Sequence, residues 1–390
     1  MYRIGQEEID AVARVINSKQ LFKVNSGDLQ ESYNFEKEFC EKLNTKHTIL
    51  MTSGQGALVS ALIGMGVGPG DEVIVPAYTY IATGMAVVAV GAMPVIAEID
   101  DSLMLDPNDF EKKITPRTKA VIPVHLMGYP CDMDKICAIA KKHNIMVLED
   151  ACQADGGSYK GKRLGTIGDA GAFSFNYFKV ITAGEGGALV TDNQLIYERA
   201  LIYHDSSAVA FFGNQMEDFE TVPFCGTELR TNEITAAILR EQLKKLDTIL
   251  SDLRKNKKKL MDKLAPHFEF VRSNDIDGDC GTTITLKFTS SDEAEKFVEN
   301  FGNNPPYPTI PYNTGKHVYS RWTPILEKRG ALNPHMNPFN MAQNKAPEYS
   351  EDMCKKSIEI LKRHVHIAIN PDWTDEEIDE LTKKTINARN

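Results

Sequence analysis

The stretch AFSFNYFKVITAGEGGALVTD, residues 172–192, says most about the fold and chemistry of this chain. Two phenylalanines flank Ser174 in a strand-like alternation, Lys179 follows five residues later, and three glycines enclose Glu185 before a second apolar run. A lone lysine is usually a solvated surface charge. The residues beside this lysine are apolar: Phe178, Val180 and Ile181. Such a setting would desolvate an ammonium group, as suits a lysine that forms a Schiff base.

Outward from this stretch, residues 48 to 195 alternate short apolar runs with helical patterns, as stacked βαβ units do. Four apolar runs are predicted strands: DEVIVP (71–76), MPVIAEID (93–100), KAVIPVHLMG (119–128) and NIMVLEDA (144–151). The segment CDMDKICAIAKKHN (131–144) has helical spacing. Because the apolar runs are continuous, the strands are expected to be covered on both faces. The pattern predicts an α/β fold with a mainly parallel sheet.

The character of the chain changes after about residue 232, where a long charged amphipathic helix begins. Beyond it, 282–288 is a predicted strand, 291–301 a helix, 303–350 a Pro- and Asn-rich loop region, and Thr374 with Glu377 a capping box that opens a last helix. A chain of 390 residues also exceeds what one core usually supports. We expect a large cofactor-binding domain over 1–245 and a smaller α+β domain over 246–390, on which the N-terminal residues could pack.

Composition narrows the class of protein. The net charge of −10 gives no electrostatic footprint for nucleic acid or an anionic membrane, and no apolar run reaches about 18 residues. The N-terminus lacks a secretion-signal pattern, so a cytoplasmic protein is expected. Seven cysteines without a CxxC pair predict neither a disulfide framework nor a metal site. His364 and His366 have no companion ligands and are expected at the surface or at an interface.

The residues required to bind pyridoxal 5'-phosphate (PLP) occur in an order that suits a parallel sheet. Asp150 ends a predicted strand, where it could keep the ring nitrogen protonated; a helix N-cap is the alternative. The loop TSGQGAL (52–58) leads into a helix whose first N–H groups, around Gln55 and Gly56, would bind a phosphate, although glycines also serve plain turns. Ser174 could donate its hydroxyl to the same phosphate. Tyr80 could lie flat on the ring, or simply pack in the core.

Together these motifs resemble the sugar aminotransferases of the DegT/DnrJ/EryC1/StrS family over nearly the whole chain. The resemblance rests on five segments: Gly54-Gln55-Gly56, Gly70-Asp71-Glu72-Val73, Glu149-Asp150-Ala151-Cys152-Gln153, Ser174 to Lys179, and Gly184-Glu185-Gly186-Gly187. Patterns such as TPRTKA (115–120) and the aromatic stretch ending in Tyr319 and Trp322 are similar to members that make an amino-octulosonate sugar.

The resemblance implies a fold-type I PLP enzyme with a mainly parallel seven-stranded sheet, a smaller α+β C-terminal domain, and a homodimer that shares its active sites. It implies Lys179 as the lysine bound to the cofactor, Asp150 at the ring nitrogen, Gln153 near the ring hydroxyl, Ser174 on the phosphate and Tyr80 over the ring. Glutamate or glutamine would donate the amino group to a keto- or aldehydo-sugar, nucleotide-linked or of the octulosonate type, for polysaccharide or secondary-metabolite biosynthesis.

Two positions depart from the family pattern. Gln55 stands where a threonine is usual, so contacts there would come from backbone N–H groups or the glutamine amide. Glu228 stands where an asparagine usually reaches across the dimer to the phosphate. A carboxylate there would be repelled by about 4 kcal/mol at 4 Å and an effective dielectric near 20. Glu228 must therefore turn away, pair with Arg230, be protonated, or meet a cation such as the amino donor.

Two rival functions follow from the same residues. A PLP-dependent sugar dehydratase of this family would have histidine in place of Lys179. A non-catalytic PLP-binding regulator could keep the fold, although the intact set of Asp150, Ser174 and Lys179 argues against it. Three residues are candidates for substrate contacts or for purely structural roles: His204, Tyr312 and His317.

Overall fold

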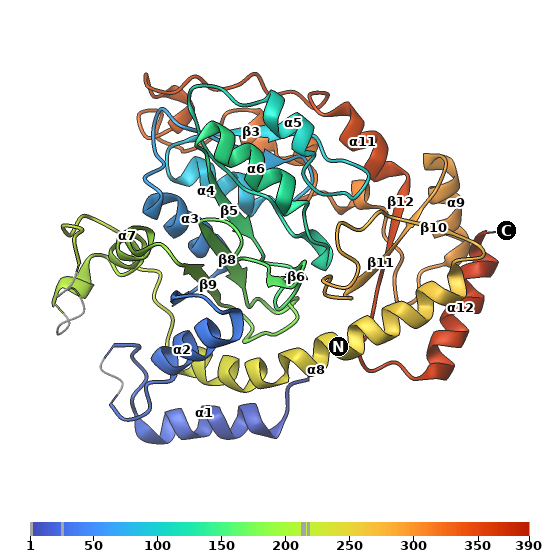
Figure 1. Cartoon of the computed structure of the whole chain (residues 1–390), viewed down its shortest axis with the longest axis horizontal. Helices are drawn as coiled ribbons and strands as arrows, with labels where there is room; N and C mark the ends of the chain where they lie inside the picture. The colour runs from blue at the N-terminus through green and yellow to red at the C-terminus, as the bar shows by residue number, and fades with distance from the viewer. Residues whose placement is uncertain (1–2, 25–26, 212–215, 217–218, 390) are drawn as a thin grey trace.

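A seven-stranded sheet forms the centre of the molecule in the computed structural model, which describes residues 3–24, 27–211, 216 and 219–389. The strand order is β1-β9-β8-β5-β4-β2-β3 (Figure 1). The strands are β1 (His47–Met51), β2 (Glu72–Pro76), β3 (Met93–Ala97), β4 (Thr118–Val121), β5 (Met146–Asp150), β8 (Ala170–Ser174) and β9 (Gly187–Thr191). Only β9 runs antiparallel to its neighbours. The prediction of a mainly parallel α/β sheet is confirmed.

Helices pack around this sheet. They are α2 (Glu31–Leu43), α3 (Gly54–Gly64), α4 (Ala82–Ala89), α5 (Pro107–Lys112), α6 (Met133–His143) and α7 (Gln194–His204). The two phenylalanines that flank Ser174 are buried because they pack against α2. Phe173 and Phe175 are both fully buried and meet Phe39 of α2 edge to face, with ring centroids 5.2 and 5.7 Å away. This aromatic cluster anchors the strand that leads to Lys179.

One predicted strand is shorter than expected. The apolar run 119–128 was expected to form one strand, but β4 ends at Val121. Pro123 has no N–H for the ladder, and the chain then turns through a short 3-10 segment, Leu126–Gly128, in which Met127 has a left-handed backbone with φ 54°. Apolar composition alone did not reveal this turn. The remaining predicted strands and the helix at 131–144 are confirmed within three residues at each end.

The long helix α8 (Glu233–Leu264) connects the large sheet to a second, smaller sheet (Figure 1). Asn232 caps it by accepting a 3.0 Å bond from the N–H of Thr235. The second sheet contains β10 (Glu269–Phe270), β11 (Thr283–Lys287) and β12 (His364–Ala368), with α9 (Ser291–Phe301), α11 (Lys355–Lys362) and α12 (Asp375–Arg389) around it. The predicted capping box at Thr374 and Glu377 is present, with bonds of 2.8 and 3.2 Å.

The N-terminal helix α1 (Gln6–Ser18) lies alongside α8 (Figure 1). Its buried Ala11 and Val15 pack against Ala237 of that helix. Arg3 bonds to Asp252 in the second half of α8 and to Asp372. Because α8 runs without interruption through the expected boundary at 245/246, the division into two domains stays a prediction.

The loop region 303–350 folds back over the large sheet. It contains the short helix α10 (Thr323–Leu326) and a few 3-10 turns. Trp322 is fully buried against Gly84 of α4, and the hydroxyl of Tyr349 donates a 2.8 Å bond to the carbonyl of Pro94. Within this segment Val318 pairs with Tyr78, just after β2. The C-terminal part of the chain thereby reaches the carboxyl end of the large sheet.

The expectation for His364 and His366 is wrong. Both lie on β12 and are buried, at 1% and 6% exposure. His366 bonds through one ring nitrogen to the Tyr78 hydroxyl at 3.0 Å and through the other to Thr285 at 2.8 Å. These bonds offset the cost of burying the imidazole, and they connect the two sheets.

The smallest sheet is the hairpin of β6 (Ser158–Tyr159) and β7 (Lys162–Arg163). Among the described residues, no helix combines the length and apolar character needed to cross a membrane.

Candidate active site

Asp150 lies at the carboxyl end of β5 with 5% of its surface exposed. Its Oδ2 accepts a 2.7 Å bond from the hydroxyl of Thr83, and its Oδ1 accepts a 3.2 Å bond from the N–H of Cys152. Because Thr83 donates to the carboxylate, it accepts from Thr79 at 2.8 Å. No helix starts after β5 in this part of the chain, so the N-cap alternative for Asp150 does not apply. The carboxylate is held in one orientation at a sheet edge that suits ligand binding.

A Gly-rich helix start lies next to this carboxylate. Ser53 caps α3 by accepting a 3.0 Å bond from the N–H of Gly56. A Cβ on Gly54 would come within 2.7 Å of Cys152 Sγ and 2.8 Å of Ser174 Cβ. The first turn of α3, where Gln55 is exposed and Gly56 buried, therefore approaches Ser174 as closely as a backbone can. The positive end of α3 and the Ser174 hydroxyl thus lie side by side, an arrangement that suits a phosphate group.

Lys179 follows β8 in a turn closed by a 2.9 Å bond from its own N–H to the carbonyl of Asn176. Its ammonium has no hydrogen-bond or ion-pair partner among the described residues. Burial raises the pKa values of Cys152 and Asp155 and lowers that of His317, and the charge of Lys179 acts on all three, in each case toward a lower pKa. The amine therefore lies close to the end of β5. The apolar surroundings are only partly as expected, because Phe178 is 76% exposed whereas Ile181 is fully buried.

Gln153 and Tyr80 complete the set of predicted cofactor contacts. The Oε1 of Gln153 accepts a 3.1 Å bond from the N–H of Met127, which orients the side-chain NH₂ group. Tyr80 is 42% exposed, so it is not a core residue. Its ring centroid lies 5.5 Å from that of His317, and Lys316 Nζ lies 5.4 Å from the ring. An exposed aromatic face thus lies between His317 and Lys316.

The three candidate substrate residues lie in different places. His317 adjoins Tyr80, and burial with the nearby charges of Lys316 and Lys179 lowers its pKa to about 4. Tyr312 lies instead beneath the cations of Arg321 and Lys362, with its ring 5.7 and 4.7 Å from them. His204 is 1% exposed, and its Nδ1 is bonded to the Leu201 carbonyl. The structure brings only His317 into the cluster around Lys179; substrate contacts by all three stay predictions.

The structure shows which of the four alternatives for Glu228 occurs. It pairs with Arg230, whose backbone N–H also donates a 3.0 Å bond to Glu228 Oε1. Arg230 forms a second ion pair with Asp205. A guanidinium between two carboxylates offsets the negative charge that Glu228 brings to this region.

Sequence reasoning missed three residues of this site: Thr79, Thr83 and Lys316. Thr83 lies in the first turn of α4, whereas Thr79 lies in the turn before the helix, so no helical spacing in the sequence indicated that their hydroxyls meet. No local signal predicted Lys316, because the loop region 303–350 reaches the site only through tertiary packing.

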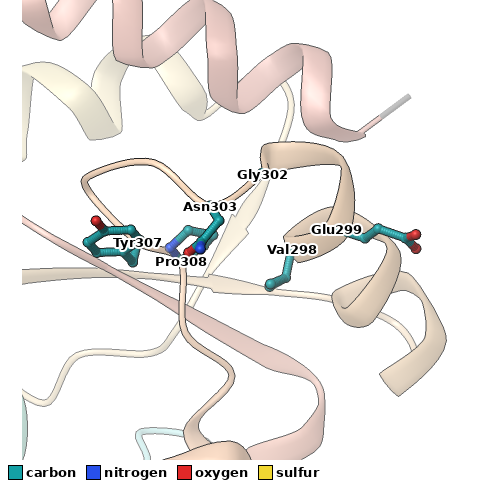
Figure 2. Close-up of a pocket in the computed structure, with 6 residues that line it drawn as sticks. All are labelled: Val298, Glu299, Gly302, Asn303, Tyr307 and Pro308. Atoms are coloured by element: carbon teal, nitrogen blue, oxygen red, sulfur yellow. The ribbon is translucent and has the colours of Figure 1, made fainter.

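A separate pocket of about 240 Å³ lies between the end of α9 and the segment that follows it (Figure 2). It is lined by Val298, Glu299, Gly302, Asn303, Tyr307 and Pro308. Figure 2 shows the Glu299 carboxylate pointing away from Tyr307 and Pro308. None of the residues predicted for catalysis or cofactor binding lines this pocket, so it is no part of the candidate active site.

The side chains around Lys179 fit PLP. An amine that has no partner among the described residues, a fixed carboxylate and the Gly-rich start of α3 gather near the carboxyl ends of β5 and β8. The exposed ring of Tyr80 contacts His317, whose pKa the charge of Lys179 helps to lower. These groups match the aldehyde, ring nitrogen, phosphate and ring face of the cofactor.

Comparison with known proteins also identifies an aminotransferase family. Residues 2–301 match the DegT/DnrJ/EryC1/StrS aminotransferase family. The chain is 38% identical over 273 residues to the spore coat polysaccharide biosynthesis protein SpsC of Bacillus subtilis (strain 168), covering 69% of this chain and 68% of that protein. It is 42% identical over 240 residues to the dTDP-3-amino-3,4,6-trideoxy-alpha-D-glucose transaminase of Streptomyces venezuelae, covering 61% and 60% of the two chains.

A solved structure extends the likeness to the whole chain. The X-ray structure of S. venezuelae DesV in complex with a ketimine intermediate has a TM-score of 0.79 and 30% identity to this chain. The match covers 98% of this chain and 94% of that one. The chain therefore belongs to the DegT/DnrJ/EryC1/StrS family of PLP-dependent aminotransferases.

Proposed function

We propose that this protein is a transaminase that moves an amino group from glutamate or glutamine to a keto- or aldehydo-sugar. The observation that carries this proposal is the Lys179 amine, which has no partner among the described residues and, like the fixed carboxylate of Asp150, lies near enough to Cys152 to affect the pKa of its thiol. The curated relatives named above support a sugar as the acceptor. Because the chain matches only 60% to 68% of their lengths, the acceptor is part of the proposal.

Each residue of the site has a role in this chemistry. When bound, PLP supplies an aldehyde that captures amines and a ring that withdraws electrons. Asp150 holds a proton on the ring nitrogen, and Thr83 keeps that carboxylate in place. Ser174 and the first N–H groups of α3 bind the phosphate. The NH₂ group of Gln153 donates to the ring hydroxyl oxygen, because its carbonyl is already occupied by Met127.

Lys179 is the general acid and base in this proposal. Its Nζ would hold PLP through the aldehyde, and as a free amine it would take a proton from the amino-bearing carbon of the donor and deliver a proton to the carbonyl carbon of the acceptor. Tyr80 and His317 cover the ring and keep water from it. His317 is neutral near pH 7 because its pKa is about 4, so it can accept or donate one hydrogen bond to a sugar hydroxyl.

A homodimer with shared active sites is part of the proposal, as is a cytoplasmic location. Exposed aromatic side chains support the dimer: Tyr177 at 53%, Phe178 at 76% and Phe211 at 85%. Two of them directly precede Lys179 in sequence. Large exposed aromatic residues are enriched in protein interfaces, so a second subunit would cover the turn that carries the lysine.

The experiment has two steps. Glutamate or glutamine is added to PLP-loaded protein, and the visible absorbance should bleach as the amino group moves onto the cofactor. Keto-sugars and aldehydes, both nucleotide-linked and octulosonate-type, are then screened with ¹⁵N-labelled glutamate for transfer of the label. If neither donor bleaches the band, the protein is not a transaminase of the proposed kind.

A further inference from the structure

Met127 has a strained backbone beside the candidate active site. Its φ of 54° lies in the left-handed region, which residues with a side chain seldom adopt, and Gly128 follows with φ 81°. Such a conformation persists where surrounding contacts hold it, and it is common at functional sites. The N–H of Met127 donates the 3.1 Å bond to Gln153 Oε1. The strained turn therefore determines how the amide of Gln153 is oriented.

Two hydrogen bonds from the segment before β11 hold this turn. The Thr282 hydroxyl donates a 2.7 Å bond to the carbonyl of Met127. The N–H of Cys280 donates a 3.0 Å bond to the carbonyl of Gly128. The fit is close, since a Cβ on Gly128 would lie 2.8 Å from Cys280 Cβ and from Thr282 Oγ1. Met127 thus accepts a bond from Thr282 on one side and donates a bond to Gln153 on the other.

The backbone of Thr282 is itself fixed by the small sheet and by α8. Its carbonyl accepts a 2.9 Å bond from the N–H of Ile369, which follows β12. Three residues before Thr282, the buried Asp279 forms an ion pair with Lys257 of α8 at 2.5 Å. The Thr282 hydroxyl therefore reaches the turn at Met127 from a segment that is held at both ends.

We propose that Thr282 is a positioning residue that acts through Met127 on Gln153, and so fixes the donor for the ring hydroxyl of the cofactor. The proposal rests on the role of Gln153 given above. A backbone N–H can only donate, so the bond from Met127 selects the carbonyl oxygen of Gln153 and leaves its NH₂ group for the ring oxygen. Without the Thr282 hydroxyl, the Met127 carbonyl loses this bond and the turn can leave the left-handed region. The N–H of Met127 then no longer orients the amide.

The test is a pH titration of the cofactor-loaded protein. The visible spectrum changes when the nitrogen that links Lys179 to the cofactor loses a proton, and the midpoint of this change is measured. The negative ring oxygen favours the protonated nitrogen, and a hydrogen-bond donor on that oxygen weakens this attraction. Removing or misplacing the donor should therefore raise the midpoint.

The variants separate Thr282 from Gln153. Gln153→Ala should raise the midpoint by about one pH unit, and Thr282→Val, which replaces the hydroxyl with a methyl group, by at least about half a unit. Thr282→Ser retains the hydroxyl and should stay near wild type. Thr282→Val combined with Gln153→Ala should match Gln153→Ala alone, because Thr282 acts through Gln153. Thr282→Ala also lacks the hydroxyl and keeps the test valid if Thr282→Val does not fold.

Thr382→Val is the matched control, because it removes a hydroxyl that donates a bond of the same length, 2.7 Å, to the carbonyl of Ile378 in α12. Its midpoint should equal that of wild type. Midpoints of Thr282→Val and Thr282→Ala within about 0.2 units of wild type would overturn the proposal. So would a shift by Thr282→Val that is just as large in protein that already carries Gln153→Ala. If wild-type protein shows no band that depends on Lys179, the proposed function fails instead, so the two failures are distinguishable.

Discussion

Replacing Asp150 with asparagine removes the charge opposite the ring nitrogen and little else. Asparagine has nearly the same shape, and its oxygen can still accept the 2.7 Å bond that Thr83 donates to Asp150. The carboxylate is 5% exposed and held by two hydrogen bonds, so water screens it poorly. Two unit charges about 4 Å apart at an effective dielectric near 20 attract by about 4 kcal/mol. Each 1.36 kcal/mol changes a rate by a factor of ten, so losing this attraction corresponds to a rate that is about a thousandfold lower.

We therefore expect Asp150→Asn to slow the glutamate half-reaction by about a thousandfold. The assay is stopped-flow bleaching of the visible band with saturating glutamate. A cofactor analogue methylated on the ring nitrogen carries a fixed positive charge, so it should recover part of the rate in Asp150→Asn. A rate within about tenfold of wild type would refute the assignment of the charge to Asp150.

Three further predictions follow from the geometry. Thr83→Val leaves Asp150 without a charge-assisted bond worth about 1.5–3 kcal/mol, so the same rate should fall at least about tenfold, whereas Thr83→Ser should stay near wild type. Gly54→Ala would place a methyl group 2.7 Å from Cys152 Sγ and should weaken PLP binding, measured by equilibrium dialysis, at least about tenfold; Gly68→Ala, with no atom nearer than 4.0 Å, should not. Burial lowers the pKa of His204 and of His366 to about 3, below the value near 6.5 of an unfolded chain. The unfolded state therefore binds more protons between pH 6.5 and 3, and each histidine should lower the free energy of unfolding by about 1.4 kcal/mol per pH unit as pH falls through that window. Denaturant titrations of wild type and His366→Asn at pH 5 and pH 7 would test this, and equal pH dependence in both would contradict it.

Local patterns predicted the large sheet because its strands are short, apolar and separated by Gly or Pro. They failed where one residue overruled the pattern: Pro123 ends β4 early although the run continues to Gly128. His366 was misplaced for a different reason. Its burial depends on Tyr78 and Thr285, which lie 288 and 81 residues away in sequence.

In the active site too, local sequence patterns predicted some residues and missed others. Asp150, Ser174 and Lys179 were predictable because they lie at strand ends or just beyond, where topology alone brings them together. Lys316 was missed and His317 was only one of three substrate candidates, because the loop that carries them reaches Tyr80 through tertiary contacts: backbone bonds from Thr79 and Ile81 and the packing of Trp322 on Gly84.

The central claim is that the nitrogen of Lys179 binds the cofactor. Borohydride treatment of PLP-loaded protein fixes that bond, and peptide mapping by mass spectrometry then identifies the modified residue. We expect one phosphopyridoxyl group per chain, on the peptide that contains Lys179, and no fixed cofactor in Lys179→Ala. Stoichiometric modification of another lysine, such as Lys316, with Lys179 unmodified would contradict it.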